Sequence, residues 1–279
     1  MQRTIALLLF LLAAPLLGQP ISASSGNLTP AEGQALVTRA LANELNAAQD
    51  ASHPMRYRLH KTSPRYTTTK EIVETRDGDV ARLIEVFDKP LDPAGEQGEQ
   101  ARLTELEGDP AKQRKRKQAE EQDADRAMKV LRALPTALVY QYAGSSEGSA
   151  TNLEKFTFRP NPSFSPPDLE TQVLTQISGE IWIDAAHQRV TRLEAHLQQD
   201  VDFGWGILGR LNKGGWIVIE QADVGEGQWR TVRFQMVMSG RVVFKNRVFD
   251  TTEDQTHFVP VPKEMGFQDA IKALREDPR

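Results

Sequence analysis

The chain has 279 residues, no cysteine, a formal net charge of -4 and 7% aromatic residues. This length suits one or two domains. The lack of cysteine excludes thiolate metal sites, cysteine nucleophiles, disulfide scaffolds and acylation at a lipoprotein cysteine. A weakly acidic chain does not have the basic surface of a nucleic-acid-binding protein, so we expect no nucleic-acid partner.

Residues 1–23 are predicted to be a signal peptide. Arg3 provides the positive n-region, the stretch from Ile5 to Leu17 is apolar, and small residues follow it. The apolar stretch is shorter than the roughly 20 residues that cross a bilayer, so a cleaved leader is favoured over an uncleaved anchor. Cleavage after Gly18 and cleavage after Ala23 remain alternatives. We therefore expect a periplasmic or secreted protein with a single domain at 24–279.

An N-terminal helix is predicted directly after the leader. Thr29 can serve as the N-cap, Pro30 suits the first turn, and Glu32 completes a capping box. Apolar residues then recur at spacings of three and four, which predicts one buried stripe and a helix end near Asp50. The stripe consists of Leu36, Val37, Ala40, Leu41 and Leu45.

A three-stranded meander is expected next. Met55, Tyr57 and Leu59 alternate with polar residues, which is typical of a half-buried strand. The Thr- and Val-rich segment 66–75 and the segment 80–87 are the second and third strands, joined by a turn at 77–79.

A charged segment at 95–134 interrupts the β pattern. Residues 95–133 hold nine acids and nine bases, including the run Arg114-Lys115-Arg116-Lys117. The acids cancel the field that would hold a polyanion. An apolar stripe between Ala124 and Leu134 predicts a helix over about 112–134, ended by Pro135. We interpret this segment as a helical or partly disordered insertion exposed to solvent.

The C-terminal half is predicted to be an antiparallel sheet, because its strands alternate between one apolar and one polar face. Glu180, Asp184 and Arg192 are expected on the polar face. Phe234, Met236, Met238, Phe244 and Val248 are expected together on the apolar face. The predicted strands are 138–142, 156–158, 179–184, 189–197, 216–223, 229–239 and 241–250, with tight turns at 225–227 and 239–240 and a final helix at 267–274.

Two motifs match enzyme signatures in letters only. Gly144-Ser145-Ser146-Glu147-Gly148 lacks the strand-to-helix context of a nucleophile elbow, so a plain loop is favoured. The Gly-x-Gly-x-x-Gly string at 204–209 is not followed by a helix, so a dinucleotide site is rejected. It is instead a pliable apolar loop that covers a cavity or contacts a partner through Trp205, Ile207 and Leu208, or a wide hairpin with these side chains tucked in.

No set of residues supports catalysis. The five histidines are not spaced for metal binding on a helix. Glu180 and Asp184 are about 13 Å apart along one strand, too far for a carboxylate pair. We therefore predict no catalytic residue, no metal site and no cofactor.

The strand Gly179-Glu180-Ile181-Trp182-Ile183-Asp184, followed by Arg189-Val190-Thr191-Arg192-Leu193-Glu194, resembles the LolA/LolB lipoprotein-carrier superfamily. The resemblance implies an α+β fold in which a curved antiparallel β-sheet, an incomplete barrel, wraps around a few helices. It also implies a hydrophobic cavity for acyl chains. The residues facing that cavity would be Ile181, Ile183, Leu193, Leu197, Phe234, Met236 and Phe244.

Two functions follow as hypotheses. The first is an exported, non-catalytic binding protein that holds a lipid or lipoprotein acyl chain in this cavity and contacts a membrane surface transiently. The second is an envelope interaction or sensing scaffold that binds a protein partner through the charged helix or the loop around Trp205.

Overall fold

The protein is built on one large antiparallel sheet. The computed structural model describes residues 28–146, 153–203, 209–242 and 245–276. Its strands are β1 (Met55–Thr62), β2 (Thr67–Val73), β3 (Val80–Val86), β4 (Lys89–Pro90), β5 (Leu138–Ser146), β6 (Leu153–Pro160), β7 (Ile177–Asp184), β8 (Arg189–Leu197), β9 (Val201–Phe203), β10 (Gly209–Leu211), β11 (Trp216–Asp223), β12 (Trp229–Val242) and β13 (Lys245–Pro260).

The sheet is open. Its 13 strands follow the order β4-β3-β2-β1-β13-β12-β11-β8-β7-β6-β5, with β10 paired to β12 and β9 paired to β10. The outermost strands, β4 and β5, are not paired with each other, so the sheet does not close into a barrel. The predicted α+β class, the antiparallel pairing and the β1-β2-β3 meander are confirmed.

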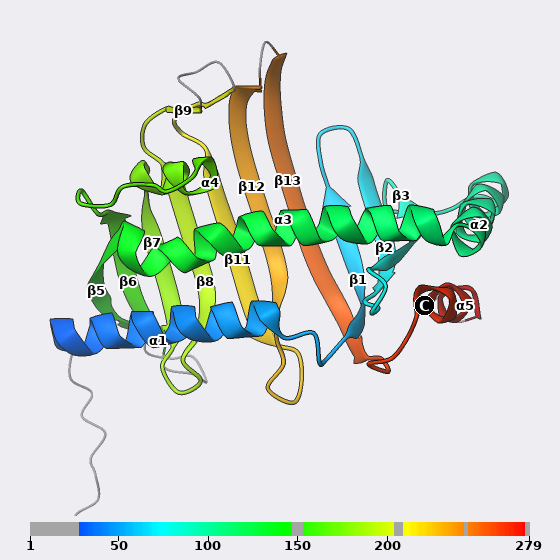
Figure 1. Cartoon of the computed structure of the whole chain (residues 1–279), viewed down its shortest axis with the longest axis horizontal. Helices are drawn as coiled ribbons and strands as arrows, with labels where there is room; N and C mark the ends of the chain where they lie inside the picture. The colour runs from blue at the N-terminus through cyan, green and yellow to red at the C-terminus, as the bar shows by residue number, and fades with distance from the viewer. Residues whose placement is uncertain (1–27, 147–152, 204–208, 243–244, 277–279) are drawn as a thin grey trace, which may run out of the picture.

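The helices are α1 (Pro30–Gln49), α2 (Pro93–Gly108), α3 (Pro110–Ala137), α4 (Leu169–Gln172) and α5 (Phe267–Glu276), with a 3-10 turn at Val173–Thr175. In Figure 1, α1 and α3 run side by side across one face of the sheet, whereas α2 and α5 lie near β2 and β3. Among the described residues, none of these helices combines the length and apolar character needed to cross a membrane.

A buried carboxylate holds α1 against the sheet. The predicted capping box between Thr29 and Glu32 starts the helix. Further along, Glu44 is 8% exposed and accepts hydrogen bonds from Arg189 Nε at 2.8 Å, from the Val190 backbone N at 2.9 Å and from Gln221 Nε2 at 3.0 Å. A buried charge is tolerated only with such partners, so this cluster sets the position of α1 over β8 and β11.

Two separate hydrophobic cores lie at opposite ends of the strand order. The first joins α1, the end of α3 and strands β5 to β8, and it contains fully buried Val37, Phe156, Ile181 and Ile183. The second joins α2 and α5 to β2 and β3. Strands β1, β13, β12 and β11 lie between these two cores.

Helix α3 spans the distance between the two cores. Its last turns bury Leu134 and Ala137 in the first core. At its other end, the buried Gln113 donates from Nε2 to the carbonyls of Asp77 and Gly78, at 3.0 and 3.1 Å. With 28 residues, α3 is about 42 Å long. It therefore reaches from β5 to the turn between β2 and β3.

The charged segment is helical on both sides of Asp109. It forms two helices: Asp92 caps α2, and Asp109 caps α3 by accepting from the Lys112 backbone N. The prediction that Pro135 ends the helix is wrong, because α3 continues to Ala137. A proline this near the C-terminus removes only one helical hydrogen bond, and burial of the last turn offsets that loss.

The predicted turn at 239–240 is also wrong. Strand β12 continues to Val242, and β13 begins at Lys245. A Cβ on Gly240 would lie 2.3 Å from the carbonyl oxygen of Arg210, so this glycine is needed for the close approach of β10. In this pairing, even-numbered residues of β12 lie opposite odd-numbered residues of β13. Val248 therefore pairs with Ser239 and lies on the opposite face from Met236.

Asp184 differs from its predicted place on the polar face. It is only 1% exposed, and it accepts from the His187 backbone N at 2.9 Å while pairing with His187 Nδ1 at 3.0 Å. The carboxylate thus closes the turn between β7 and β8. A register shift between Trp182 and Ile183 accompanies this change of direction.

Candidate functional site

The predicted ligand-binding residues fall into two groups. Ile181, Ile183 and Leu197 are at most 2% exposed, and Leu193 is partly buried against the same core. Phe234 and Met236 on β12 are half-buried. Phe244 lies outside the described residues. The structure thus places Ile181 and Ile183 inside the first core, buries Leu197 outside it, and leaves Phe234 and Met236 near the middle of the sheet.

Phe234 and Met236 belong to a larger apolar surface, called here the apolar strip. Strand pairing joins Ile217 to Met236, Ile219 to Phe234, and Met238 to Phe249. Residues two apart on a strand share a face, so all six side chains lie on one face. Ile217 also packs against the core under α1, which identifies this face as the one that the helices cross. The strip consists of Ile217, Ile219, Phe234, Met236, Met238 and Phe249.

The strip is not covered by close helix packing. All residues from 118 to 127 in the middle of α3 are exposed, so no side chain of this stretch is buried against the sheet. In the strip, the five residues of β11 and β12 are half-buried, and Phe249 is 43% exposed. A helix crosses an apolar surface here without filling it.

Sequence reasoning did not single out Ile217, Ile219 and Phe249 for the site. Alternation along β11 already places Ile217 and Ile219 on one face, so that signal was present. Phe249 could not be placed, because its face depends on the position of the hairpin turn.

The opposite face of the sheet carries a row of paired charges. Trp182 lies between Lys155 Nζ and the Arg192 guanidinium, at 5.0 and 5.5 Å from the ring centre. The row continues with ion pairs from Arg192 to Glu220 and from Arg233 to Asp254. Because these charges are paired across neighbouring strands, this face is suited to solvent rather than to an apolar ligand.

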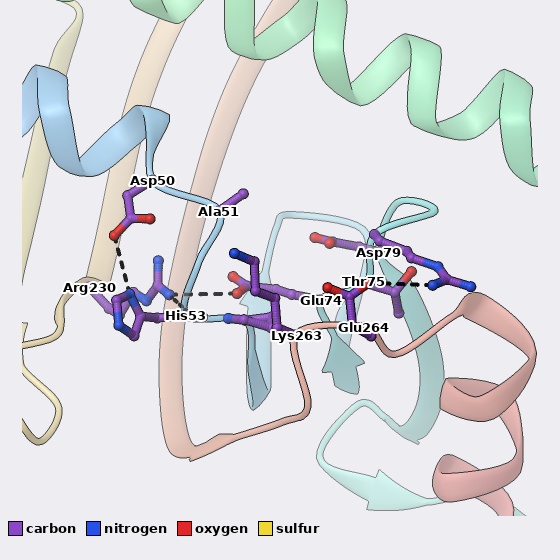
Figure 2. A pocket seen from close by; sticks show the side chains of 11 residues that line it. Asp50, Ala51, His53, Glu74, Thr75, Asp79, Arg230, Lys263 and Glu264 are labelled. Atoms are coloured by element: carbon purple, nitrogen blue, oxygen red, sulfur yellow. Dashed lines mark hydrogen bonds and ion pairs between the residues drawn. The ribbon is translucent and has the colours of Figure 1, made fainter.

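A polar pocket of about 470 Å³ lies beside the end of α1. Figure 2 shows its side chains converging from the end of α1, the ends of β2 and β3, and the segment after β13, below α3. Its charged lining residues are Asp50, His53, Glu74, Arg76, Asp79, Arg230, Lys263 and Glu264.

Most charges of this pocket are already paired. Arg230 lies 3.7 Å from Glu74, and Arg76 lies 3.5 Å from Glu264. Lys263 has no ion pair or hydrogen bond with any described residue, and the Nε of Arg230 is buried without an acceptor. Lys263 is therefore the cation of this pocket that a bound anion would meet.

Asp79 is the most perturbed acid of the pocket. Burial, together with the nearby carboxylates of Glu74 and Glu120, raises its pKa from 3.8 to about 7, and Arg116 opposes this shift. Its backbone N donates to Glu120 Oε2 at 3.2 Å, which brings α3 close to the start of β3. Near neutral pH this carboxyl therefore titrates beside the contact that anchors α3.

The other predicted sites are either not described by the structure or not supported by it. Trp205, Ile207 and Leu208 lie outside the described residues. Ser146 is the last residue of β5, and no described histidine is hydrogen-bonded to it. Among the described residues, no group of three or more histidine or acidic side chains has metal-binding geometry.

Comparisons with known proteins give one structural match. No family model matches the sequence, and no curated protein does. The fold is similar to a solved structure from Vibrio parahaemolyticus described as a "putative outer membrane lipoprotein-sorting protein domain", with 11% identity and a TM-score of 0.30. The alignment covers 80% of this chain and 91% of that chain.

Proposed function

We propose that this protein is an exported, non-catalytic binding protein that holds a lipid or a lipoprotein acyl chain between α3 and the apolar strip. The observation that carries the proposal is an apolar surface crossed by a helix whose middle turns do not pack on it. Residues 1–23 are proposed to be the cleaved signal peptide, which places the mature protein in the periplasm or outside the cell.

Burial of an acyl chain supplies enough free energy for this function. Each buried methylene contributes about 0.8 kcal/mol. A chain with about ten methylenes on the strip would gain on the order of 8 kcal/mol, which corresponds to a dissociation constant near the micromolar range. Met236 and Met238 are flexible, so one surface can accept chains of different shape.

The polar pocket is proposed to bind the anionic head group of such a ligand. Arg230 and Phe234 are on the same strand, and four residues of β-strand extend about 13 Å. In this proposal an amphiphile lies with its chain on the strip and its anionic group near Lys263.

The proposal is tested by lipid content and by paired variants of β12. Mass spectrometry of protein purified from periplasm should find bound lipid, and the protein should take up a fluorescent fatty acid. Met236→Asp should abolish uptake, because it puts a charge on the strip. Val237→Asp is the matched control, since the next residue along β12 points to the opposite face. Equal uptake by both variants would contradict the proposal.

A second candidate is an envelope scaffold that binds a protein partner through α3. The exposed middle of α3 carries Glu120, Glu121, Asp123, Asp125 and Arg126 and is accessible around its circumference. Replacing Glu121, Asp123, Asp125 and Arg126 by glutamine, with Glu120 left to accept from the Asp79 backbone N, discriminates between the two candidates. Loss of a co-purifying protein with fatty-acid uptake intact would favour the scaffold.

A further inference from the structure

The end of the β12–β13 hairpin projects beyond the rest of the sheet. Strand β1 pairs with β13 only from Thr252 onward, and β11 pairs with β12 only up to Val237. Beyond these points β12 keeps a neighbour in the short strand β10, while residues 245–251 of β13 have no second neighbour among the described strands and form an edge there. In Figure 1 this end of the hairpin is the uppermost part of the sheet.

One stretch of the hairpin is basic although the chain as a whole is acidic. No acid occurs between Glu226 and Asp250, whereas this stretch contains Arg230, Arg233, Arg241, Lys245 and Arg247. Lys245 and Arg247 are exposed, and the side chain of neither forms an ion pair or hydrogen bond with another described residue. Lys245 and Arg247 therefore present positive charge that no described side chain pairs with.

The same end exposes large apolar side chains. Val248 is 73% exposed and Phe249 is 43% exposed. They lie on opposite faces of β13, so the end of the hairpin is apolar on both sides. Apolar residues this exposed beside unpaired cations are unusual for a surface in contact only with water.

We propose that the hairpin tip, defined as Lys245, Arg247, Val248 and Phe249, docks on the surface of a membrane that contains anionic lipids. Basic residues are attracted to the negative surface potential, and apolar side chains next to them enter the interfacial region. This inference does not rest on the acyl-chain proposal, because the hairpin tip and the apolar strip can be altered separately apart from Phe249.

One other surface and one other kind of partner fit the observations less well. The basic run of α3 at 114–117 is followed closely by Glu120, Glu121, Asp123 and Asp125, so its field is cancelled, and no large apolar residue is exposed beside it. A protein strand could pair with the free edge of β13. However, Lys245 and Arg247 lie on that edge. Charged side chains on an edge strand disfavour pairing with an uncharged segment or with a second copy of the same edge.

The test is sedimentation with vesicles. The full-length mature protein should bind vesicles of equal parts phosphatidylcholine and phosphatidylglycerol, should not bind pure phosphatidylcholine, and should be released by added salt. Lys245→Gln with Arg247→Gln should weaken binding roughly 25-fold, about fivefold for each lost cation. Val248→Ser should weaken it further. Arg114→Gln with Lys115→Gln is the matched control, because it removes the same charge from α3.

Equal weakening by the hairpin and α3 pairs would overturn the proposal, since binding would then depend on net charge alone. Binding to pure phosphatidylcholine that the hairpin pair leaves unchanged would also overturn it. So would concentration-dependent dimerisation that the hairpin pair abolishes without any vesicle binding, because the edge would then be a protein interface. Fatty-acid uptake by the Lys245→Gln/Arg247→Gln variant is measured in parallel, so that failure of the carrier function is seen independently.

Discussion

Asp79 provides a quantitative test of the electrostatics beside α3. Its carboxyl is raised from a pKa of 3.8 to about 7, mainly by burial and then by Glu74 and Glu120. Between these two values the folded protein keeps a proton that the unfolded chain has lost. The destabilisation from this group is therefore absent below the unfolded pKa, grows as the pH rises, and is complete above the folded pKa.

The magnitude follows from the size of the shift. One pKa unit is worth about 1.4 kcal/mol, so the shift corresponds to at most about 4 kcal/mol. The cost of ionising Asp79 should be about 2 kcal/mol at about pH 5 and about 4 kcal/mol at about pH 8. No described side chain or backbone group is hydrogen-bonded to this carboxylate, so an asparagine loses no partner there.

Asp79→Asn should therefore stabilise the protein, and more strongly at high pH. Urea denaturation of the variant and the wild type at both pH values gives the difference in unfolding free energy. That difference should grow by about 2 kcal/mol between about pH 5 and about pH 8. Asp125→Asn, on the exposed middle of α3, is the control. A difference for Asp79→Asn that is the same at both pH values would refute the reasoning.

Four further substitutions test the packing of the fold. Glu44→Ala leaves Arg189 without its buried partner and should reduce the unfolding free energy by about 3 to 5 kcal/mol in urea denaturation; unchanged stability would contradict the role assigned to this ion pair. Leu103→Ala, in a fully buried position of the second core, should cost about 2 to 5 kcal/mol by the same measurement, and a cost below 1 kcal/mol would mean that this core relaxes around the cavity. Gly240→Ala should separate β10 from β12 and accelerate tryptic cleavage at Arg210. In contrast, a Cβ on Gly98 in α2 meets nothing within 4 Å, so Gly98→Ala should raise the unfolding free energy by up to about 1 kcal/mol.

Local features of this fold were predictable because their causes lie within a few residues. The capping box of Thr29 and Glu32 starts α1 as expected, and the apolar stripe that follows is largely buried. The alternation that places Ile181 and Ile183 on the buried face also holds, because side-chain direction along a strand depends only on position.

The errors arose where a distant segment decides the outcome. The Ser-Gly pair at 239–240 is typical of a turn. Gly240 instead allows β10, about thirty residues earlier in the chain, to lie close to β12. That misplaced turn assigned Val248 to the wrong face and left Phe249 unrecognised. Asp184 was expected to be solvated because its burial depends on the turn it closes, not on the alternation of β7.

The sequence by itself determined the class of fold, the amphipathic helices, the alternating strands and the basic character of the stretch between Glu226 and Asp250. Only the tertiary structure decided which apolar surface stays uncovered. Helix α3 is anchored at one end by Leu134 in a hydrophobic core and at the other by Gln113 on the β2–β3 turn. Periodicity in the sequence indicates which face of a helix or strand is apolar. Whether another element covers that face, and what pKa a carboxyl such as Asp79 has, depends on groups that folding brings together from distant positions.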